Sequence, residues 1–460
     1  MLSVAIKRVI YACCPSVLEP TLARIEASEI GYRLAKGAFW SITGAVISRG
    51  LMLAASIVLA RVLGKKGFGE LGIIQATVGM LQIFAGFALG LTATKYVAEY
   101  RTKDPARAGR VIALSGITTA CTAAGIAVML LVLAPYLSSG ILKAPHLTNM
   151  LRVGSLMLFL GGINGAQTGA LSGFEAFKTI AHVNLAAGLL SFPLMVLGVY
   201  WGGLVGAVWG LNASLAANWV VNHFALRKEA RLAGVPLRLR GCWQEREILV
   251  TFSLPSVLGG IVLAPVTWVC SAILVRQENG FSEMGIFNAA NQWRTAILFL
   301  PGILGQVALP LLTNLYGEGK HSEYHKVLRH NIYISGAVTL LAATILSAGS
   351  WFIMGIYGEG FAIGYPVLIL LSISAVLMAI NNVIGQVIAS MGKMWAGFAL
   401  NLLWASVLIF CTWIWRTLGA VGFGLATLVS YCFHSATCSV FAYKYLRLQD
   451  VIISRPTSTP

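Results

Sequence analysis

The chain has 460 residues, of which 57% are hydrophobic and only 11% are charged, and its mean hydropathy is +0.79. Soluble globular domains carry about 25% charged residues, so this composition excludes an ordinary soluble enzyme and indicates a protein that crosses a membrane many times. The formal net charge is +17. Because the basic residues stand in short loops between apolar runs, and not on one soluble face, we expect no nucleic-acid partner.

The first predicted element is an N-terminal segment, residues 1–36, that we expect to be cytoplasmic or interfacial, because its apolar stretch before Pro15 is too short for a signal peptide. About twelve apolar segments follow, each long enough to span a bilayer as a helix. They are predicted near 38–63, 71–94, 111–134, 151–172, 179–200, 204–223, 249–275, 285–309, 331–356, 367–390, 396–415 and 423–442. Only WGG separates the fifth from the sixth, which predicts a tight helical hairpin.

These spans divide into two predicted bundles. The first six form a bundle over residues 37–224 and the last six a bundle over 249–443, with a basic cytoplasmic loop at 225–248 between them and a cytoplasmic tail at 444–460. With the N-terminus in the cytoplasm, loops on that side hold 24 basic residues and those on the other side hold seven. Short cytoplasmic loops are enriched in Lys and Arg, so we expect both termini inside.

One short motif recurs in the two halves. GFGELG, residues 67–72, matches the dinucleotide-binding pattern G-x-G-x-x-G, but GFGELGI recurs as GFSEMGI at 280–286 with Ser282 in place of the central glycine. The repeat spans six segments, so the two halves should have the same orientation in the membrane. We therefore interpret the glycines as tight turns between helices, with Glu70 and Glu283 at the start of the helix that follows.

Charged residues are scarce inside the predicted spans. All sixteen acidic residues fall in predicted loops or tails, whereas Arg49 lies in the first span and Arg294 in the eighth. An arginine within a bilayer costs about 2.5–3.5 kcal/mol on insertion scales, so both should face water, backbone carbonyls or an anionic ligand. Snorkelling or a structural hydrogen bond is the alternative, and it applies more to Arg49 than to Arg294.

Amide side chains form polar stripes at matching places in the two halves. Those that we place in the predicted site are Asn288, Asn291 and Gln292 in span 8, Gln75 and Gln82 in span 2, Asn164 in span 4 and Asn382 in span 10. Spans 4 and 10 carry the further amides Gln167, Asn381 and Gln386. Any one of them can serve as an interhelical hydrogen bond. Their recurrence in both halves favours a shared central cavity, which we predict to bind the substrate together with the two arginines.

Other polar and helix-bending residues give weaker signals. Pro301 and Pro310 predict a bend in span 8, because proline removes a backbone donor. His182 and His434 can carry protons, but we interpret each as an ordinary polar contact. The sequence shows no metal-ligand spacing, disulfide framework or cofactor motif, so we expect neither a metal nor a cofactor.

Two segments carry a family resemblance. ARVLGKKGFGELGIIQATVGMLQIFAGFALGLTATKYVAEYRTKDPARAGRVIALS (60–115) resembles the N-terminal signature of bacterial oligosaccharide flippases, which move O-antigen or exopolysaccharide units and belong to the multidrug/oligosaccharidyl-lipid/polysaccharide exporter superfamily. GIFNAANQWRTAILFLPGILGQVALPLLTNLYGEG (285–319) is similar to the same family's second-half signature. The resemblance implies an all-α fold of twelve transmembrane helices, in two six-helix bundles around a central cavity.

The same resemblance implies a substrate and a place in the cell. A flippase of this kind moves a polyprenyl-pyrophosphate-linked oligosaccharide from the cytoplasmic to the outer leaflet of the bacterial inner membrane by alternating access. Arginine binds phosphate oxygens in a fork, and amides suit sugar hydroxyls. Arg49 has no counterpart at the equivalent Val262, so the cationic lining should be asymmetric. Membrane lipids, a polysaccharide polymerase and a chain-length regulator are the candidate partners.

Two other functions stay open from the sequence. A multidrug antiporter for cationic compounds would be expected to use carboxylates inside the membrane, and none is predicted there. A membrane glycosyltransferase or polymerase would need a substantial outer loop or acidic groups at the membrane surface. The sequence names neither the glycan, nor the energy source or coupling ion, nor the oligomeric state.

Overall fold

The computed structural model describes residues 29–453 except 238, 255, 258–260, 319 and 392. Within that part of the chain the secondary structure is entirely helical, and seven helices are long and apolar enough to cross a membrane. The predicted all-α, polytopic membrane fold is therefore confirmed. Most of the predicted N-terminal segment and the last seven residues of the predicted tail lie outside the described residues.

The first half of the chain contains five long helices. They are α3 (Glu29–Gly86), α4 (Leu89–Tyr100), α5 (Pro105–Pro135), α6 (Thr148–Gly173) and α7 (Phe177–Leu232), with the short helical turns η2 (Tyr136–Ile141) and η3 (Pro145–Leu147) between α5 and α6. Two of these hold two spans each, because α3 breaks at Gly64 and α7 breaks at Gly203, both with positive φ. A Cβ at Gly198 would overlap the Gly206 carbonyl, so the arms of α7 pack closely and the predicted hairpin is confirmed.

The second half begins with short turns and continues as seven further helices. The turns are η4 (Cys242–Glu245) and η5 (Leu249–Ser253); the helices are α9 (Leu263–Val275), α10 (Gly280–Ile297), α11 (Phe299–Gly317), α12 (His321–Ala348), α14 (Tyr365–Ser390), α15 (Met394–Ile414) and α16 (Gly419–Ile453). The short α13 (Ser350–Gly355), η6 (Ala362–Gly364) and η7 (Arg416–Leu418) occupy the connections. Helix α7 continues to Leu232, because the charged residues after 225 favour helix, and it therefore overlaps the start of the predicted basic loop.

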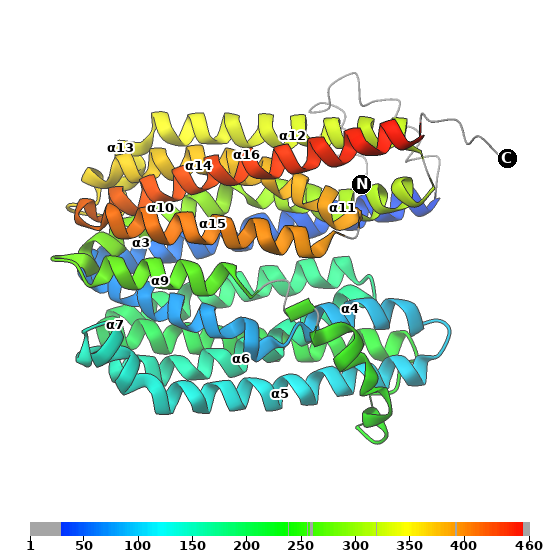
Figure 1. Cartoon of the computed structure of the whole chain (residues 1–460). Helices are drawn as coiled ribbons and strands as arrows, with labels where there is room; N and C mark the ends of the chain where they lie inside the picture. The colour runs from blue at the N-terminus through cyan, green and yellow to red at the C-terminus, as the bar shows by residue number, and fades with distance from the viewer. Residues whose placement is uncertain are drawn as a thin grey trace, which may run out of the picture.

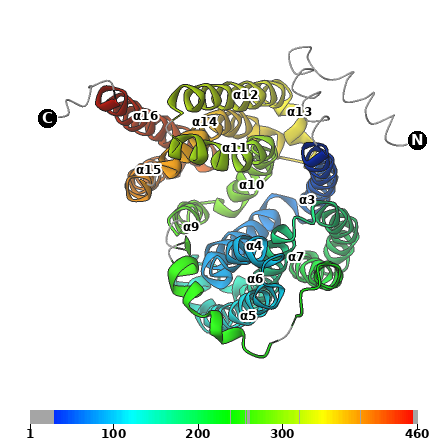
Figure 2. The same ribbon diagram turned by 90° about the vertical axis from the view of Figure 1, so that its right-hand side faces the viewer.

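The long helices run roughly side by side, and the described chain begins and ends at the same end of the molecule (Figure 1). We call this the terminal end and the opposite one the far end. Seen from the terminal end, α4–α7 gather on one side and α10–α16 on the other, with α3 and α9 between the two groups (Figure 2). These groups correspond to the two halves of the sequence, and we treat them below as the first and second half.

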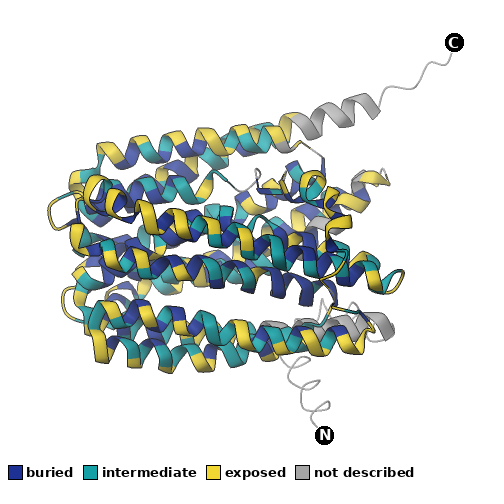
Figure 3. Cartoon of the chain, turned by 90° about the horizontal axis from the view of Figure 1, so that it is seen from below, coloured by how far each residue is buried: buried dark blue, intermediate teal, exposed yellow. Residues whose placement is uncertain are grey.

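Apolar side chains cover much of the outer surface. Exposed residues lie along the outward sides of the helices, and buried ones face the interior (Figure 3). Among the exposed side chains are Val132, Phe352 and Trp201, which are 72%, 73% and 84% exposed. Such extensive apolar exposure is expected where the surrounding solvent is lipid.

The repeated glycine motif lies where the two halves meet at the far end. Gly69 in α3 faces Phe281 in α10, and a Cβ at Gly69 would overlap the Phe281 carbonyl. A Cβ at Gly285 would likewise overlap the Lys65 carbonyl. The turn itself falls earlier, at Gly64, so the prediction that the motif glycines form the turns is wrong. They instead allow two helix backbones to cross without intervening side chains.

The two acidic residues of the motif tie neighbouring helices together. Glu283 lies in the first turn of α10, as predicted, and its Oε2 accepts a hydrogen bond from the Ala420 amide at 2.7 Å. That amide begins α16, where a helix N-terminus favours a negative charge. Glu70 Oε1 lies 3.0 Å from His146 Nε2 of η3. Each carboxylate therefore connects the helix that follows its turn to another far-end connection.

The second and eighth spans are both broken near their middle. The break between α3 and α4 has positive φ at Phe87 and Ala88, and the break between α10 and α11 falls at Leu298. Pro301 lies one turn after Leu298 and cannot donate to the preceding turn, so the predicted bend is confirmed there, whereas α11 continues through Pro310. No proline stands in span 2, and its break was not predicted.

The connection between the halves is held against the first half. Glu245 of η4 is buried, and its carboxylate accepts hydrogen bonds from Arg107 Nε at 2.9 Å and Arg110 Nη2 at 3.0 Å. Both arginines belong to α5. Further on, Ser253 Oγ of η5 lies 2.8 Å from Thr92 Oγ1 of α4. The second half is therefore anchored to the first before α9 begins.

Candidate functional site

A cavity of about 310 Å³ lies mainly in the second half, and three of the predicted site residues line it. Asn288, Asn291 and Arg294 all belong to α10 and are spaced three residues apart, so they fall along one side of that helix. The remaining wall comes from α3, α9, α14, α15 and α16. We call this the Arg294 cavity.

Arg294 lies deep in the membrane-spanning part of the molecule. It stands fourteen residues after the start of α10 at the far end, which at about 1.5 Å per residue places it about 21 Å along the helix. The hydrocarbon core of a bilayer is about 30 Å thick, so this depth is within the core. The neighbouring helix α16 places Tyr431 close enough for an electrostatic interaction with the guanidinium.

The cavity presents polar groups that lack partners. Within the described residues, Arg294 has no ion pair or hydrogen bond, and the lining residues include no carboxylate. Asn291 Oδ1 and Trp404 Nε1 are buried without a hydrogen-bond partner, and both residues belong to the lining. Buried unpaired groups are costly. Arg294 and Trp404 Nε1 are donors and suit a ligand that accepts hydrogen bonds and carries negative charge, whereas Asn291 Oδ1 is an acceptor and suits a donor such as a hydroxyl.

Arg49 is placed apart from the Arg294 cavity. It lies on the first span of α3, fifteen residues before the break at Gly64, at a depth of about 22 Å that is comparable with that of Arg294. Its side chain is exposed, and its guanidinium carbon lies 4.3 Å from the ring centroid of Phe299. Since Phe299 begins α11, Arg49 makes a cation–π contact from the first half to the second.

The other predicted amides lie outside the Arg294 cavity, and most of them contact neighbouring helices. Gln292 accepts a hydrogen bond from Ser56, Asn164 donates to the Leu215 carbonyl at 3.0 Å, Gln82 packs against Gly161, Asn382 accepts from Gln386 at 3.4 Å, and Gln75 is exposed. The structure therefore brings together three of the nine predicted site residues. Binding by any of the nine stays a prediction.

A larger cavity, of about 710 Å³, was not predicted from the sequence. We call it the terminal-end cavity. It lies toward the terminal end, between α14, α15, α16 and the η5 segment, and Asn381, Trp395, Asn401 and His434 are among its lining residues. Asn381 adjoins the predicted Asn382 but points to a different surface of α14, since one residue is buried and the other exposed. No pattern within a single span indicated that these residues meet, because they come from three helices.

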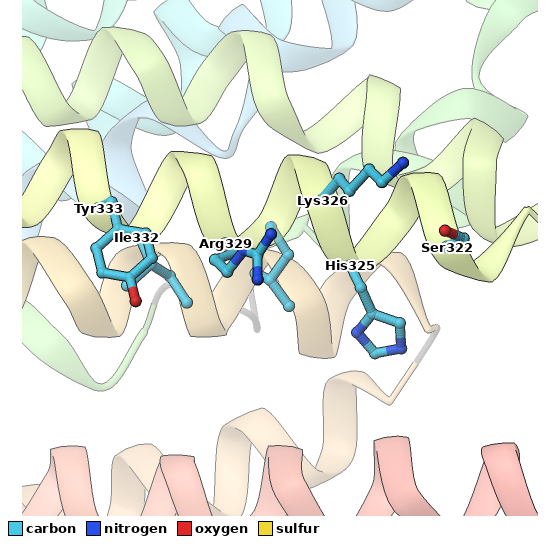
Figure 4. A pocket seen from close by; sticks show the side chains of 7 residues that line it. Ser322, His325, Lys326, Arg329, Ile332 and Tyr333 are labelled. Atoms are coloured by element: carbon cyan, nitrogen blue, oxygen red, sulfur yellow. The ribbon is translucent and has the colours of Figure 1, made fainter.

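A third cavity, of about 660 Å³, follows the outer surface of α12 near the terminal end. Figure 4 shows His325, Arg329 and Tyr333 reaching into it from successive turns of this one helix. Lys326 adds a further basic group. Basic and tyrosine side chains near a helix end suit contact with lipid headgroups, so we assign this surface to the membrane.

Comparison with known proteins agrees with this architecture. The family described as polysaccharide biosynthesis protein matches residues 34–316. The EPS I polysaccharide export inner membrane protein EpsE of Ralstonia nicotianae is 26% identical over 400 residues, which is 84% of this chain and 88% of that protein. The lipid III flippase of Escherichia coli is 22% identical over 414 residues, covering 89% of this chain and 98% of that one.

Solved structures share the fold. An inward-facing MATE family multidrug resistance transporter of the MOP superfamily superposes with a TM-score of 0.74 at 15% identity, covering 91% of this chain and all of that one. A MOP superfamily transporter from Pyrococcus furiosus gives a TM-score of 0.69 at 15% identity, with 92% and 97% covered. At these identities the likeness concerns the fold alone.

Proposed function

Because the chain belongs to the polysaccharide biosynthesis protein family, we propose that it is a flippase that moves a polyprenyl-pyrophosphate-linked oligosaccharide from the cytoplasmic to the outer leaflet of the membrane. The relatives support this proposal, since one is a polysaccharide export inner membrane protein and another a lipid III flippase. The protein is accordingly a membrane transporter and not an enzyme.

The Arg294 cavity is the structural observation that best supports this substrate. A pyrophosphate carries at least two negative charges, and a guanidinium binds phosphate oxygens in a fork. Arg294 stands within the membrane core with no ionic partner among the described residues, so an anionic headgroup would supply the missing charge. Asn288 and Asn291 stand beside it and can bind hydroxyl or phosphate oxygens.

The Arg294 cavity disfavours one of the other two functions, and the far-end carboxylates disfavour the other. A cation without a carboxylate partner repels cationic drugs, which are the substrates of the alternative antiporter. At the far end, Glu70 and Glu283 bond His146 and the Ala420 amide, so neither is held free as a catalytic acid for a glycosyltransferase. The flippase is therefore the function we retain.

The orientation follows from the distribution of basic residues. The terminal end carries the connections that are rich in Lys and Arg, so we propose that it faces the cytoplasm of a bacterium and that the far end faces outward. The close packing of α3 on α10 joins the halves at the far end. Transport would then require the halves to separate there while the polyprenyl chain stays in lipid. A polysaccharide polymerase and a chain-length regulator are the proposed partners beyond the lipids.

Leaflet transfer in liposomes tests this function. We expect the purified protein to move a fluorescent undecaprenyl-pyrophosphate oligosaccharide, measured as the fraction that an impermeant quencher reaches. Arg294→Ala should reduce the initial rate by about tenfold or more, because a charge-assisted bond to phosphate contributes about 1.5–3 kcal/mol. Arg294→Lys should recover part of the rate, because lysine keeps the charge but not the fork.

The matched control is Arg152→Ala, which removes an exposed arginine at the far end. This variant should transfer the lipid like the parent protein. Transfer no faster than in empty liposomes, with several glycans tried, would contradict the flippase. Normal transfer by Arg294→Ala would leave the flippase standing and remove Arg294 from its binding site.

A further inference from the structure

The terminal-end cavity adjoins the Arg294 cavity along two helices. On α16, His434 lines the terminal-end cavity and Tyr431, one turn earlier, lines the Arg294 cavity. On α15, Asn401 lines the terminal-end cavity and Trp404 lines the Arg294 cavity. Residues three apart on a helix are separated by only about 4.5 Å along its axis. The two cavities are therefore consecutive compartments of one half of the molecule.

An aromatic cluster stands between the two compartments. The ring centroids of Trp404 and Tyr431 lie 5.4 Å apart, and that of His434 lies 6.4 Å from Trp404 and 6.5 Å from Tyr431. Trp404 is only 2% exposed, so this cluster is a packed partition. A molecule that contacted both cavities would lie across it.

The chemistry of the terminal-end cavity differs from that of its neighbour. Its lining residues include no Asp, Glu, Lys or Arg, and their polar groups are amides, hydroxyls, one imidazole, one indole N–H and one thiol. Aromatic side chains form much of the rest, among them Phe252, Trp395 and Phe398. Phe398 packs edge-to-face on Trp395, with 6.0 Å between ring centroids, while Trp395 remains 82% exposed. The cavity is suited to a neutral ligand and not to a phosphate.

One lining residue indicates that this cavity binds something with both donors and acceptors. Asn381 is only 8% exposed, and neither its Oδ1 nor its Nδ2 has a hydrogen-bond partner within the described chain. Leaving both atoms of a buried amide unpaired is unfavourable, and buried amides in folded proteins are normally bonded. A hydroxyl can satisfy both atoms, because it donates and accepts.

We propose that the terminal-end cavity is a saccharide subsite, which binds neutral sugar residues of the lipid-linked substrate while Arg294 binds its pyrophosphate. This inference rests on the proposed flippase function. Asn381 and Asn401 bond sugar hydroxyls, and the exposed face of Trp395 contacts the apolar face of a sugar ring. The cavity lies toward the end at which such substrates would be loaded, so it selects the glycan before the headgroup crosses.

Two fluorescent substrates separate the roles of the two cavities. Proteoliposomes would be supplied with undecaprenyl pyrophosphate bearing a neutral glucose trisaccharide, or bearing a single glucose. Asn381→Leu, Asn401→Leu and Trp395→Ala should each raise the KM for the trisaccharide substrate about tenfold, because one or two hydrogen bonds or a ring contact are lost. The same variants should leave the KM for the monosaccharide substrate within about twofold, and Arg294→Ala should impair both substrates equally.

A matched tryptophan provides the control. Trp201 is 84% exposed, nearly the same as Trp395, but lies at the far end outside the three cavities described above. Trp201→Ala should transport both substrates like the parent protein. Asn381 is buried, so Asn381→Leu can prevent folding. Asn401 and Trp395 are exposed, and variants at these two positions test the subsite in that case.

Photo-labelling gives an independent result. A trisaccharide substrate with a diazirine on its terminal sugar should label peptides of α14 and the start of α15. Labelling confined to other helices, or an unchanged trisaccharide KM in the Asn401 and Trp395 variants, would overturn the saccharide subsite while active transport leaves the flippase intact. An absence of both transport and labelling with the parent protein would overturn the flippase, and this inference with it.

Discussion

At the scale of single residues, the notable feature is that polar groups remain unpaired where lipid-facing proteins can least tolerate them. Arg294 has no ionic partner among the described residues, and Asn291 Oδ1 and Trp404 Nε1 lack hydrogen bonds beside it. A centrally placed arginine alone costs about 2.5–3.5 kcal/mol on insertion scales. We expect an arginine with this unfavourable insertion free energy to be kept because it binds a ligand during part of the transport cycle.

Asn164 gives the contrasting case, because its amide is used within the protein. It donates to the Leu215 carbonyl at 3.0 Å and accepts from Asn222 at 3.5 Å, which joins α6 to the second arm of α7. Asn164→Leu should lower the free energy of unfolding by about 1 kcal/mol, as other interhelical hydrogen bonds in membranes do. Urea or SDS titration would measure this loss, and the folded variant should keep the parent KM. A KM raised tenfold would instead place Asn164 in the binding site.

The two cases show how far residue roles follow from sequence. Asn288, Asn291 and Arg294 could be grouped because helical spacing is local and puts them on one side of one helix. Asn164 and Gln82 could not be separated from them, because Leu215 and Gly161 meet them from other helices. The terminal-end cavity was missed for the same reason, since each of its walls comes from a different helix.

At the scale of elements, the crossing of α3 and α10 depends on glycine at two positions. Gly69 and Gly285 approach the opposite backbone so closely that a methyl group at either would overlap a carbonyl oxygen. Gly69→Ala should therefore lower the melting temperature of the detergent-solubilised protein, corresponding to about 1–3 kcal/mol of overpacking. Gly125 on α5 has no heavy atom within 4 Å of an added Cβ, so Gly125→Ala is the control and should be neutral or slightly stabilising. Equal melting temperatures for the two variants would contradict the crossing.

Spans, turns and breaks differed in how well the sequence predicted them. Continuous apolar length predicted the long helices, and the WGG stretch predicted the hairpin within α7. Pro301 predicted the break near Leu298, because a missing donor is a local property. The break at Phe87 and Ala88 has no such residue. Just before this break, Thr122 Oγ1 of α5 donates a hydrogen bond to the Ala85 carbonyl at 2.8 Å, a contact with another helix that the span's own sequence does not contain.

At the scale of the whole molecule, the far end is closed by contacts between the halves. Phe68 of α3 packs edge-to-face on Phe361, with ring centroids 6.2 Å apart, and Arg61 Nε donates to the Ile356 carbonyl at 2.6 Å. Phe361 and Ile356 belong to the connection between α13 and α14. Alternating access requires these contacts to separate in each cycle.

Locking the far end should therefore stop transport. In a background without the native cysteines, Phe68→Cys with Phe361→Cys should be joined by a short bis-methanethiosulfonate, because the parent rings are in contact. We expect transfer to fall at least about tenfold on cross-linking and to return on reduction, since only one access state remains. Each single-cysteine variant treated with the same reagent is the control. Undiminished transfer by the fully cross-linked protein would show that the far end does not open.

The Glu245 anchor on α5 has a consequence for how the chain can be assembled. Glu245 bonds Arg107 and Arg110 of the first half. The exposed Leu239 precedes Glu245, so a chain divided after Leu239 keeps Glu245 in the fragment that contains the second half. Two fragments, 1–239 and 240–460, should thus find one another when coexpressed and copurify through a tag on either one. Glu245→Ala should weaken this association, because it leaves both arginines without their carboxylate. Recovery of equal amounts with and without the substitution would show that the spans alone recognise each other.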